Sequence, residues 1–183
     1  MTDLRALRVK VRIIKDQPLH AQLVNQIIEF DRRNMKPILD KAGIQFPEEK
    51  RRRGFQNNPT FIIAFDAQTI AGYLEYVRSW NDPNYIYIAS LQIDQRYRNS
   101  HVLIELLTKF RSLTLTEDFQ GFETNVQKAN SAAVKLCRKA GFRLEQNPNN
   151  EASWLALAGK ELLQTSRVGT LLDRWNERTS HTP

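Results

Sequence analysis

Leu91–Leu107, LQIDQRYRNSHVLIELL, is the stretch that decides the fold of this chain. It begins inside a run of β-branched and aromatic residues, NYIYIASLQI at Asn84–Ile93, which predicts a buried strand. Apolar residues then recur at helical spacing, which predicts an amphipathic helix. These residues are Val102, Leu103, Leu106, Leu107 and Phe110. The stretch is therefore the end of a strand, a short basic turn and the first turns of a helix.

The basic turn has the features of an anion site. Arg96, Arg98, Asn99 and Ser100 lie where the new helix presents unpaired backbone N–H groups. The helix dipole adds to the charge of the two guanidinium groups, so a phosphate-bearing ligand is the obvious candidate. The alternative is a polar turn whose arginines are simply solvated, and on these residues alone that is the better interpretation.

Composition narrows the class of protein. The 183 residues suit one domain with a sizeable core, and the longest apolar runs are only strand-length, so we expect no membrane span. Arg5, Arg8 and further basic residues interrupt the N-terminus, so a signal peptide is not expected. One cysteine, Cys137, excludes an intrachain disulfide and suits a reducing cytoplasm. One cysteine and three scattered histidines give no zinc-ligand spacing, so no metal is expected.

The net charge of +7 is concentrated near the N-terminus. Residues 1–60 contain 13 Lys and Arg against 7 Asp and Glu, whereas residues 61–183 contain 14 against 13. The densest point is Lys50–Arg53, and such a patch attracts RNA, DNA or an acidic partner. A solvated helix end preceded by Glu48 and Glu49 is the interpretation that the sequence favours, and nucleic acid stays the second.

The segments before the deciding stretch alternate between strand and helix patterns. Arg8–Lys15 alternates charged and apolar residues like a half-exposed strand, and Asp16 and Pro18 then start a helix. Pro37 predicts a break or kink in that helix, near the preceding residue. A short helix within 43–59 comes next, and two strands follow it at Thr60–Phe65 and Thr69–Val77.

The segments after it add a strand, a helix, a hairpin and a tail. Asn130 is expected to cap the helix and Gly141 to end it. The other elements are a strand at Gly121–Gln127, a hairpin of Phe142–Glu145 with Ser153–Ala158, and a tail at Lys160–Arg178 with apolar residues at helical spacing.

This order of elements resembles the GNAT superfamily of acyl-CoA N-acyltransferases, and two motifs carry the resemblance. Ile93–Arg98 (IDQRYR), followed by a helix, looks like the acyl-CoA motif V-x-P-E-x-R-G-x-G-x-G. Asn130–Phe142 (NSAAVKLCRKAGF) is similar to the segment N-x-x-A-x-x-L-Y-x-x-x-G-F, with four fixed residues at the right offsets. The resemblance covers about residues 8–158.

The resemblance implies an α/β (α+β) fold with a mixed, mostly antiparallel sheet of six or seven strands flanked by helices. The GNAT-like domain would occupy residues 1–159, and residues 160–183 would form a C-terminal helical extension. It also implies acetyl-CoA or another acyl-CoA as co-substrate. The last residues of the central strand, Leu91, Gln92 and Ile93, would face the pantetheine arm, and Asn130 would contact it from the other side. The pyrophosphate would bind at Arg98, Asn99, Ser100, His101, Val102 and Leu103.

Three departures from the family pattern concern catalysis and ligand binding. The motif glycines fall at His101 and Leu103, whose side chains bring bulk to the pyrophosphate site. The tyrosine that protonates the leaving thiolate in the family falls at Cys137, a weaker candidate that is also explained as a small buried helix residue. The position of the base in some relatives is Tyr87 here, and Glu75 on the neighbouring strand is the nearest carboxylate.

Two classes of function follow. The first is an N-acyltransferase in which a neutral amine attacks the thioester directly, and the acceptor is a small molecule, a peptide or an aminoacyl-tRNA. The second is a GNAT-fold protein that has lost catalysis and serves as a CoA-sensing or macromolecule-binding module. The lost glycines and tyrosine favour the module, whereas Arg98 and Asn130–Phe142 favour retained ligand binding. We prefer the enzyme.

The tail lies beyond the resemblance. Leu163, Val168, Leu171, Leu172 and Trp175 fall at helical spacing, and a helix of this length needs a surface to cover its apolar face. That surface is the protein's own sheet, a second copy or another protein, and we predict a homodimer. Gly169 is expected to weaken the helix.

Overall fold

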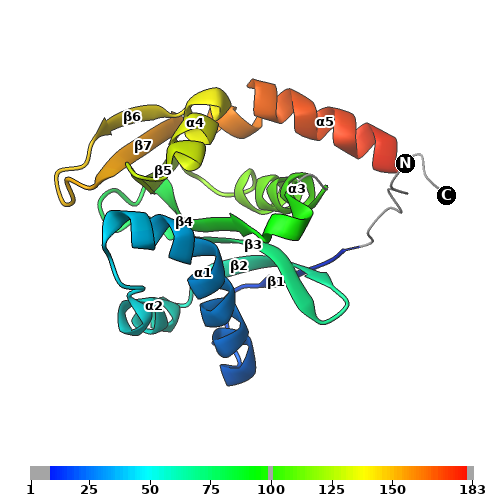
Figure 1. The fold of residues 1–183 in the computed structure, drawn as a ribbon. Helices are drawn as coiled ribbons and strands as arrows, with labels where there is room; N and C mark the ends of the chain where they lie inside the picture. Colours follow the sequence, from blue (N-terminus) through cyan, green and yellow to red (C-terminus); the bar gives the residue numbers. More distant parts are fainter. Residues whose placement is uncertain (1–8, 99–100, 181–183) are drawn as a thin grey trace, which may run out of the picture. The chain divides into compact units, whose positions relative to one another are not determined.

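A computed structural model gives the fold and describes residues 9–98 and 101–180. Asn99 and Ser100, two predicted phosphate-binding residues, lie outside the described residues. Within the described ranges the chain has seven strands and five α-helices (Figure 1). The strands are β1 Lys10–Ile14, β2 Thr60–Asp66, β3 Thr69–Arg78, β4 Tyr85–Ile93, β5 Gly121–Gln127, β6 Arg143–Gln146 and β7 Ser153–Gly159. The helices are α1 Ala21–Ala42, α2 Glu48–Gly54, α3 Val102–Thr114, α4 Ser131–Ala140 and α5 Arg167–Ser180.

The strands form one sheet in the order β1-β2-β3-β4-β5-β7-β6. β1 pairs antiparallel to β2, and β7 pairs antiparallel to both β5 and β6, whereas β4 and β5 are parallel. A parallel pair needs a long crossover connection, which here contains α3. The predicted fold class, a mixed and mostly antiparallel sheet flanked by helices, is confirmed.

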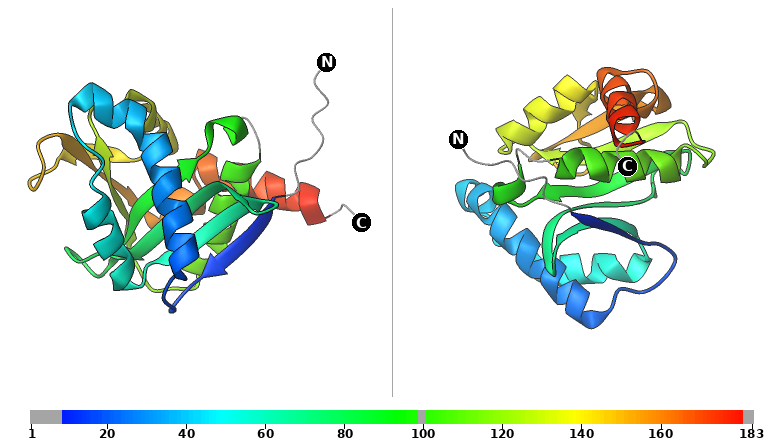
Figure 2. Two further views of the ribbon diagram at one scale, coloured as in Figure 1. Left: turned by 60° about the horizontal axis from the view of Figure 1, so that its bottom comes forward. Right: turned by 90° about the vertical axis from the view of Figure 1, so that its right-hand side faces the viewer.

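The chain divides into two compact units. Unit 1 contains the described residues up to Glu75 together with Ser90–Phe110, and unit 2 contains Tyr76–Ala89 together with the described residues from Arg111 onward. In unit 1, α1 and α2 cover one face of the strands (Figure 2). The apolar stripe of α1 packs there on side chains of β1 to β3, because alternate strand residues point to the same face. This core includes Ile14, Ile27, Ile28, Phe30, Phe55, Phe61, Ile63, Ile70 and Tyr73.

The helix α1 continues through Pro37, so the predicted break does not occur, whereas the predicted alternative, a kink, agrees with the change of direction of α1 toward its C-terminal end (Figure 2). Proline removes one backbone N–H and its bond to the carbonyl four residues earlier, that of Arg33. The last turn is held by the buried side chain of Leu39 and by Gly43, which adopts a φ of 66° and donates its N–H to the carbonyl of Asp40. Anchoring beyond the proline therefore outweighs the loss of one hydrogen bond.

Unit 2 contains a three-stranded antiparallel arrangement and α4. β7 pairs with all of β5, from Gly121 opposite Gly159 to Gln127 opposite Ser153. The prediction that Asn130 caps α4 is confirmed, since its side chain accepts from the backbone N–H of Ala133 at 3.1 Å. The helix ends at Gly141, as predicted, with a φ of 105°.

The tail is not one helix but a 3₁₀ turn at Lys160–Leu163 followed by α5. Leu163 and Leu172 of the tail are buried in unit 2. Part of the apolar face of the tail is therefore covered by residues of its own chain. Gly169 has a packing role that the sequence did not reveal: a Cβ there would lie 2.5 Å from the carbonyl oxygen of Gln164. The homodimer stays a prediction, and so does the boundary after residue 159.

The two helical glycines of α2 and α5 should respond oppositely to alanine. Gly169→Ala should lower the free energy of unfolding by about 1–3 kcal/mol, because the added methyl group meets a backbone carbonyl. Gly54→Ala adds a methyl group in open space and should be neutral or stabilising by about 0.5–1 kcal/mol. Urea unfolding of both variants measures the difference. A stabilising Gly169→Ala substitution would show that the close approach does not exist.

Candidate functional site

The turn after β4 is built around Asp94. Its backbone N–H donates to the carbonyl of Ala71 on β3 at 2.9 Å, and its carboxylate accepts from the backbone N–H of Arg96 at 3.0 Å. This cap starts a 3₁₀ turn at Gln95–Tyr97 that precedes α3. The hydroxyl of Tyr97 donates to Asp66 at 2.7 Å and fixes the turn to the end of β2. The predicted order of strand, basic turn and helix is therefore present, with an additional 3₁₀ turn.

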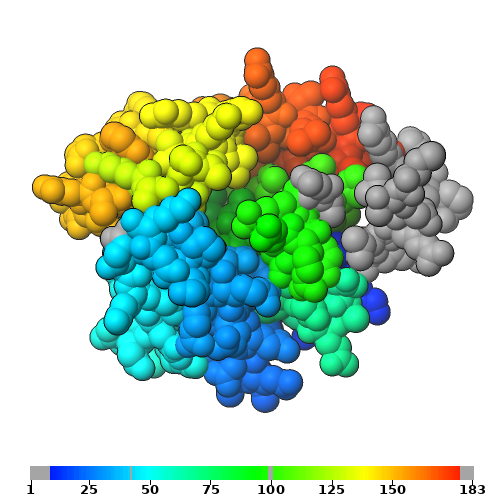
Figure 3. Space-filling model, in the orientation of Figure 1, coloured from blue at the N-terminus to red at the C-terminus, as the bar shows by residue number. Residues whose placement is uncertain are grey.

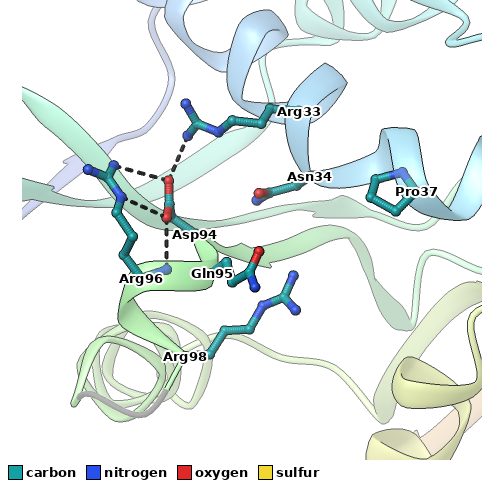
Figure 4. Close-up of a pocket in the computed structure, with 7 residues that line it drawn as sticks. All are labelled: Arg33, Asn34, Pro37, Asp94, Gln95, Arg96 and Arg98. Carbon is teal, nitrogen blue, oxygen red and sulfur yellow. Dashed lines mark hydrogen bonds and ion pairs between the residues drawn. The ribbon is translucent and has the colours of Figure 1, made fainter.

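Asp94 also holds two arginine side chains (Figure 4). Arg96 donates to it through Nε and Nη2 at 3.1 and 3.2 Å, and Arg33 of α1 donates through Nη2 at 2.7 Å. The Asp94 side chain is only 5% exposed. The hydrogen bonds from Arg96 lower the pKa of its carboxyl group, with a further contribution from Arg33. Asp94 is thus ionised at neutral pH and keeps both guanidinium groups beside the turn.

A pocket of about 540 Å³ opens between α1 and this turn. From α1 it is lined by Arg33, Asn34 and Pro37, and from the turn by Asp94, Gln95, Arg96 and Arg98. Figure 3 shows the blue atoms of α1 beside the green atoms of the turn on this face. Three arginines against one aspartate make the pocket strongly cationic, and Arg98 is exposed with no ion pair among the described residues.

Asn34 adds an unpartnered polar group to the wall of this pocket. Its Nδ2 atom is buried and has no hydrogen-bond partner among the described residues. A buried donor without a partner costs about 1–3 kcal/mol, so such groups are usually satisfied by a ligand or water. Figure 4 shows the Asn34 side chain extending from α1 toward the turn. The wall of the pocket therefore combines three arginines with an amide donor that has no partner among the described residues.

The start of α3 packs on a glycine of the sheet. Val102 is buried, and its Cγ1 would lie 3.0 Å from a Cβ placed on Gly72 of β3. The first turn of α3 therefore packs closely on β3 because residue 72 has no side chain. His101 is exposed and Leu103 is half-buried. The absence of a side chain at Gly72 thus gives the first turn of α3 room to approach the sheet.

A buried polar network joins α1, α2 and β3 in the same unit. Arg51 of α2 is its centre: Nε donates to Asp31 at 2.7 Å, and Nη1 and Nη2 lie 3.0 and 2.5 Å from the two carboxylate oxygens of Glu75. The side chains of Asp31 and Glu75 are each 3% exposed. The Arg51 guanidinium also lies over the ring of Phe55, 4.4 Å from its centroid. The candidate base Glu75 is therefore ion-paired with Arg51, although its Oε2 atom accepts no well-aligned hydrogen bond from the described residues.

Tyr73 and Gln92 extend this network to β4. The fully buried Tyr73 hydroxyl donates to Asp31, and Gln92 Nε2 donates to Asp31 at 3.0 Å. Burial raises the pKa of Asp31 and of Glu75, although the charge of Arg51 opposes the shift in both. The backbone of Gln92 was expected to face the pantetheine arm, together with its neighbours Leu91 and Ile93. The structure adds that its side chain belongs to the network.

The basic run Lys50–Arg53 is not a uniform cationic surface. Arg51 points into the network, and Arg52 donates to Glu48 at 2.9 Å and to Asn25 at 3.1 Å. Half of the run is thus engaged within unit 1. Nucleic-acid binding through it stays a prediction.

The remaining predicted site residues lie in unit 2. Asn130 uses its side-chain oxygen for the α4 cap, which leaves its amide N–H groups to reach a ligand. Cys137 is half-buried on α4, and burial raises the pKa of its thiol. Tyr87 packs against Trp80, with ring centroids 5.9 Å apart, and its hydroxyl accepts from Asn125 at 3.2 Å. The catalytic roles of Tyr87 and Cys137 stay predictions.

The parallel pairing of β4 with β5 is short. Its register covers Tyr85–Tyr87 opposite Gly121–Glu123. At the next position the Thr124 hydroxyl donates to the carbonyl of Ile88 at 2.7 Å. A side chain thus takes the place of strand pairing there.

Comparison with known proteins identifies the family. The model of the acetyltransferase (GNAT) family matches residues 24–142, more than half of the chain, and the protein belongs to this family. No curated protein matches the sequence.

Solved structures share the fold at low sequence identity. PaiA N-acetyltransferase from Thermoplasma acidophilum, in complex with coenzyme A, has a TM-score of 0.60 at 18% identity and covers 82% of this chain and 99% of its own. A GNAT-family acetyltransferase from Staphylococcus aureus Mu50 has a TM-score of 0.63 at 18% identity, with the same coverage. NAA60 from Arabidopsis thaliana, in complex with a bisubstrate analogue, has a TM-score of 0.57 at 14% identity and covers 82% and 98%.

No helix in the described part of the chain is both long and apolar enough to cross a bilayer. No group of three or more His, Cys, Asp and Glu side chains there has the arrangement of a metal site.

Removing Arg51 should destabilise the protein strongly. Arg51→Met leaves Asp31 and Glu75 buried without their cation and should cost about 3–5 kcal/mol of unfolding free energy at pH 7.5. Without Arg51 both carboxyl groups bind protons more tightly in the folded than in the unfolded state. The loss should therefore shrink as the pH falls toward about 5. Urea unfolding at several pH values measures both effects.

Arg53→Met is the matched control, because Arg53 is on the same helix but exposed. It should change stability by no more than about 0.5 kcal/mol. Equal losses in the two variants would show that the network does not stabilise unit 1.

Proposed function

We propose that this protein is an acyl-CoA-dependent N-acyltransferase and that the pocket between α1 and the β4–α3 turn binds the phosphate groups of CoA. The observation that carries the proposal is the convergence of Arg33, Arg96 and Arg98 with the unpartnered donor of Asn34 on one pocket. One guanidinium group can donate two parallel hydrogen bonds to the oxygens of a phosphate, and amide N–H groups add further donors. The pocket therefore matches a pyrophosphate or a ribose phosphate.

Family membership supports the same ligand. PaiA from Thermoplasma acidophilum contains coenzyme A in its crystal structure, and it shares the fold of this chain. In this chain the phosphate site depends on side chains rather than on glycine-rich backbone, since His101 and Leu103 stand at the motif glycines. On α1, outside the motif, Arg33 supplies a positive charge and Asn34 supplies an amide N–H donor.

The proposed reaction is direct acyl transfer. A neutral amine attacks the thioester carbonyl carbon, the C–N bond forms, and the C–S bond breaks with CoA leaving as thiolate. The protein must position the two reactants, remove one proton from the attacking nitrogen and stabilise the thiolate until it is protonated. Asn130 stays the candidate contact to pantetheine, and Cys137 the candidate proton donor to the thiolate. The acceptor is an amine of a small molecule, a peptide or an aminoacyl-tRNA.

CoA binding tests the proposal directly. CoA should raise the melting temperature of the wild-type protein, because a ligand that binds only the folded state stabilises it. Arg33→Glu should weaken CoA binding by roughly 10- to 100-fold, since it replaces an attractive charge in the pocket with a repulsive one. Calorimetry with CoA gives the affinities. No binding by the wild type at millimolar CoA would overturn the proposed function.

Lys36→Glu is the control for this charge reversal. Lys36 is on the same helix, three residues after Arg33, but it pairs with Asp40 at 2.9 Å and does not line the pocket. Its substitution should change CoA affinity by less than about threefold, because exposed charges contribute little. Equal weakening by the two substitutions would point to general electrostatic attraction and away from this pocket.

Asn34→Asp tests the unpartnered donor. The substitution preserves the shape of the side chain but replaces the buried N–H donor with an acidic oxygen that repels phosphate. CoA affinity should fall by at least about tenfold, and adenosine, which lacks phosphates, should show no corresponding loss. An unchanged CoA affinity would place the phosphates elsewhere.

A further inference from the structure

A chain of hydrogen-bonding groups runs from α1 through β3 to β4, and the acyl transfer described above does not use it. The Tyr73 hydroxyl contacts the carboxylate of Asp31 on one side and lies 3.1 Å from the hydroxyl of Ser90 on the other. Tyr73 is fully buried, Asp31 is buried and Ser90 is half-buried. The chain therefore leads from the interior of unit 1 to a more accessible position on β4.

The partners of Asp31 fix the direction of the protons in this chain. A carboxylate only accepts, so the Tyr73 hydroxyl must donate to it, and Ser90 must then be the donor in its contact with Tyr73. The Tyr73 oxygen also accepts from Arg51 Nη2 at 3.1 Å. Gln92 Nε2 lies 3.2 Å from the Ser90 oxygen and donates to it. Ser90 then keeps one lone pair for a further donor. A proton that enters at Ser90 can thus be passed to Tyr73 and from there to Asp31.

The β4 end of the chain is not saturated. Gln92 Nε2 faces oxygen atoms of Asp31, Tyr73 and Ser90, so the amide can only be oriented with its N–H groups toward them. Its Oε1 atom consequently points away, and it is buried with no donor among the described residues. A buried acceptor without a partner in a native protein calls for a functional explanation. A ligand N–H group would supply the missing donor.

The position of Ser90 and Gln92 connects the chain to the reaction. They flank Leu91 on β4, the strand whose last residues are expected to face the pantetheine arm of the acyl donor. An amine that attacks the thioester at this strand would approach beside their side chains. Glu75 makes no hydrogen bond to Tyr73, Ser90 or Gln92 among the described residues, so it lies outside this chain.

We propose that Asp31 removes the proton of the acceptor amine through Tyr73 and Ser90, which rests on the proposed acyltransferase function. As the amine nitrogen bonds to the acyl carbon, its surplus proton passes to the Ser90 oxygen. Ser90 gives its own proton to Tyr73, and Tyr73 gives its proton to Asp31. The C–S bond breaks, and the electron pair leaves with the CoA thiolate. Protonated Asp31 later loses its proton to solvent. Ser90 touches the amine, whereas Tyr73 and Asp31 act through it.

The surroundings of Asp31 suit this role. The charged or titratable groups that face it are Arg51 from α2 and Tyr73 and Glu75 from β3, and the neutral Gln92 faces it from β4. Burial raises the pKa of its carboxyl group, which makes it a better proton acceptor than an exposed aspartate. Protonation of Asp31 removes one of the two negative charges beside Arg51. The guanidinium of Arg51 stays neutralised, because Glu75 remains paired with it.

Tyr73→Phe is the sharpest test, because it deletes only the central hydroxyl of the chain. Turnover would be measured with acetyl-CoA and four probe acceptors: a peptide with a free α-amino group, an Nα-blocked peptide with one lysine, spermidine and water. With the best of these probes, kcat of the variant should fall by roughly 100-fold or more, as expected for lost proton transfer. The KM for acetyl-CoA should change by less than about threefold. The fall of wild-type kcat at acidic pH, where Asp31 becomes protonated, should disappear in the variant.

Tyr97→Phe is the matched control. It removes a tyrosine hydroxyl that donates to an aspartate in the same unit, Asp66, but lies outside the chain. In this variant kcat should still fall at acidic pH, with the same inflection in the pH profile as in the wild type. Asp31→Asn adds a second measurement, since it should also remove the inflection while CoA binding persists in calorimetry.

The outcomes separate the relay from the proposed function. If Tyr73→Phe retains the wild-type inflection and at least a third of kcat, the relay is wrong and the acyltransferase stands. If CoA binds but no probe is turned over at any pH, the relay is also overturned, because there is no transfer for it to serve. If CoA does not bind, the proposed function itself fails.

Discussion

The contact of Arg51 with Asp31 and Glu75 is the interaction on which unit 1 depends. It joins one residue from each of α1, α2 and β3, with the two carboxylates buried and the Arg51 side chain 17% exposed. A buried cation with two carboxylates is costly to desolvate and is retained only where its geometry is nearly complete. Here each charged oxygen of Glu75 and both oxygens of Asp31 have a donor nearby. The contact ties α1, which also lines the pocket, to α2 and β3.

A second contact, between Asp94 and Arg33, ties the same helix to the turn after β4. If the pocket binds the phosphates of CoA as proposed, the two contacts hold in place the side chains that do the work of the motif glycines. In a glycine-rich turn, backbone N–H groups approach the phosphates closely. In this chain the turn is capped by a carboxylate, and the cations and donors reach the pocket on side chains from two elements. Gly72 on β3 provides part of the space that the helix start requires.

Much of this fold could be predicted from local patterns, because each strand and helix carries its own periodicity. The strand Gly121–Gln127 and the helix between Asn130 and Gly141 were predicted with their bounds, since cap residues mark both ends of the helix. Pro37 does not break α1, because the helix is anchored beyond it by a tertiary effect that no local pattern reveals. Arg33 and Asn34 were missed for a similar reason: they join the turn across some sixty residues of sequence, and nothing local reveals the pairing. One signal was available for Asp31, which lies four residues after Ile27 and so interrupts the apolar stripe of α1 with a carboxylate.

The continuity of α1 through Pro37 has a consequence for how the length of this chain can vary. Asp31 points into the buried network, and Arg33 and Asn34 line the pocket, on a single helix without interruption. Successive residues of an α-helix are rotated by about 100° around its axis, so inserting or deleting one residue between them would turn one set away from its place. Substitution at these positions changes one contact, but a change of length would misplace either the network or the pocket. Insertions and deletions in relatives with the same arrangement should therefore fall before Ala21 or after Ala42, where the loops can absorb them.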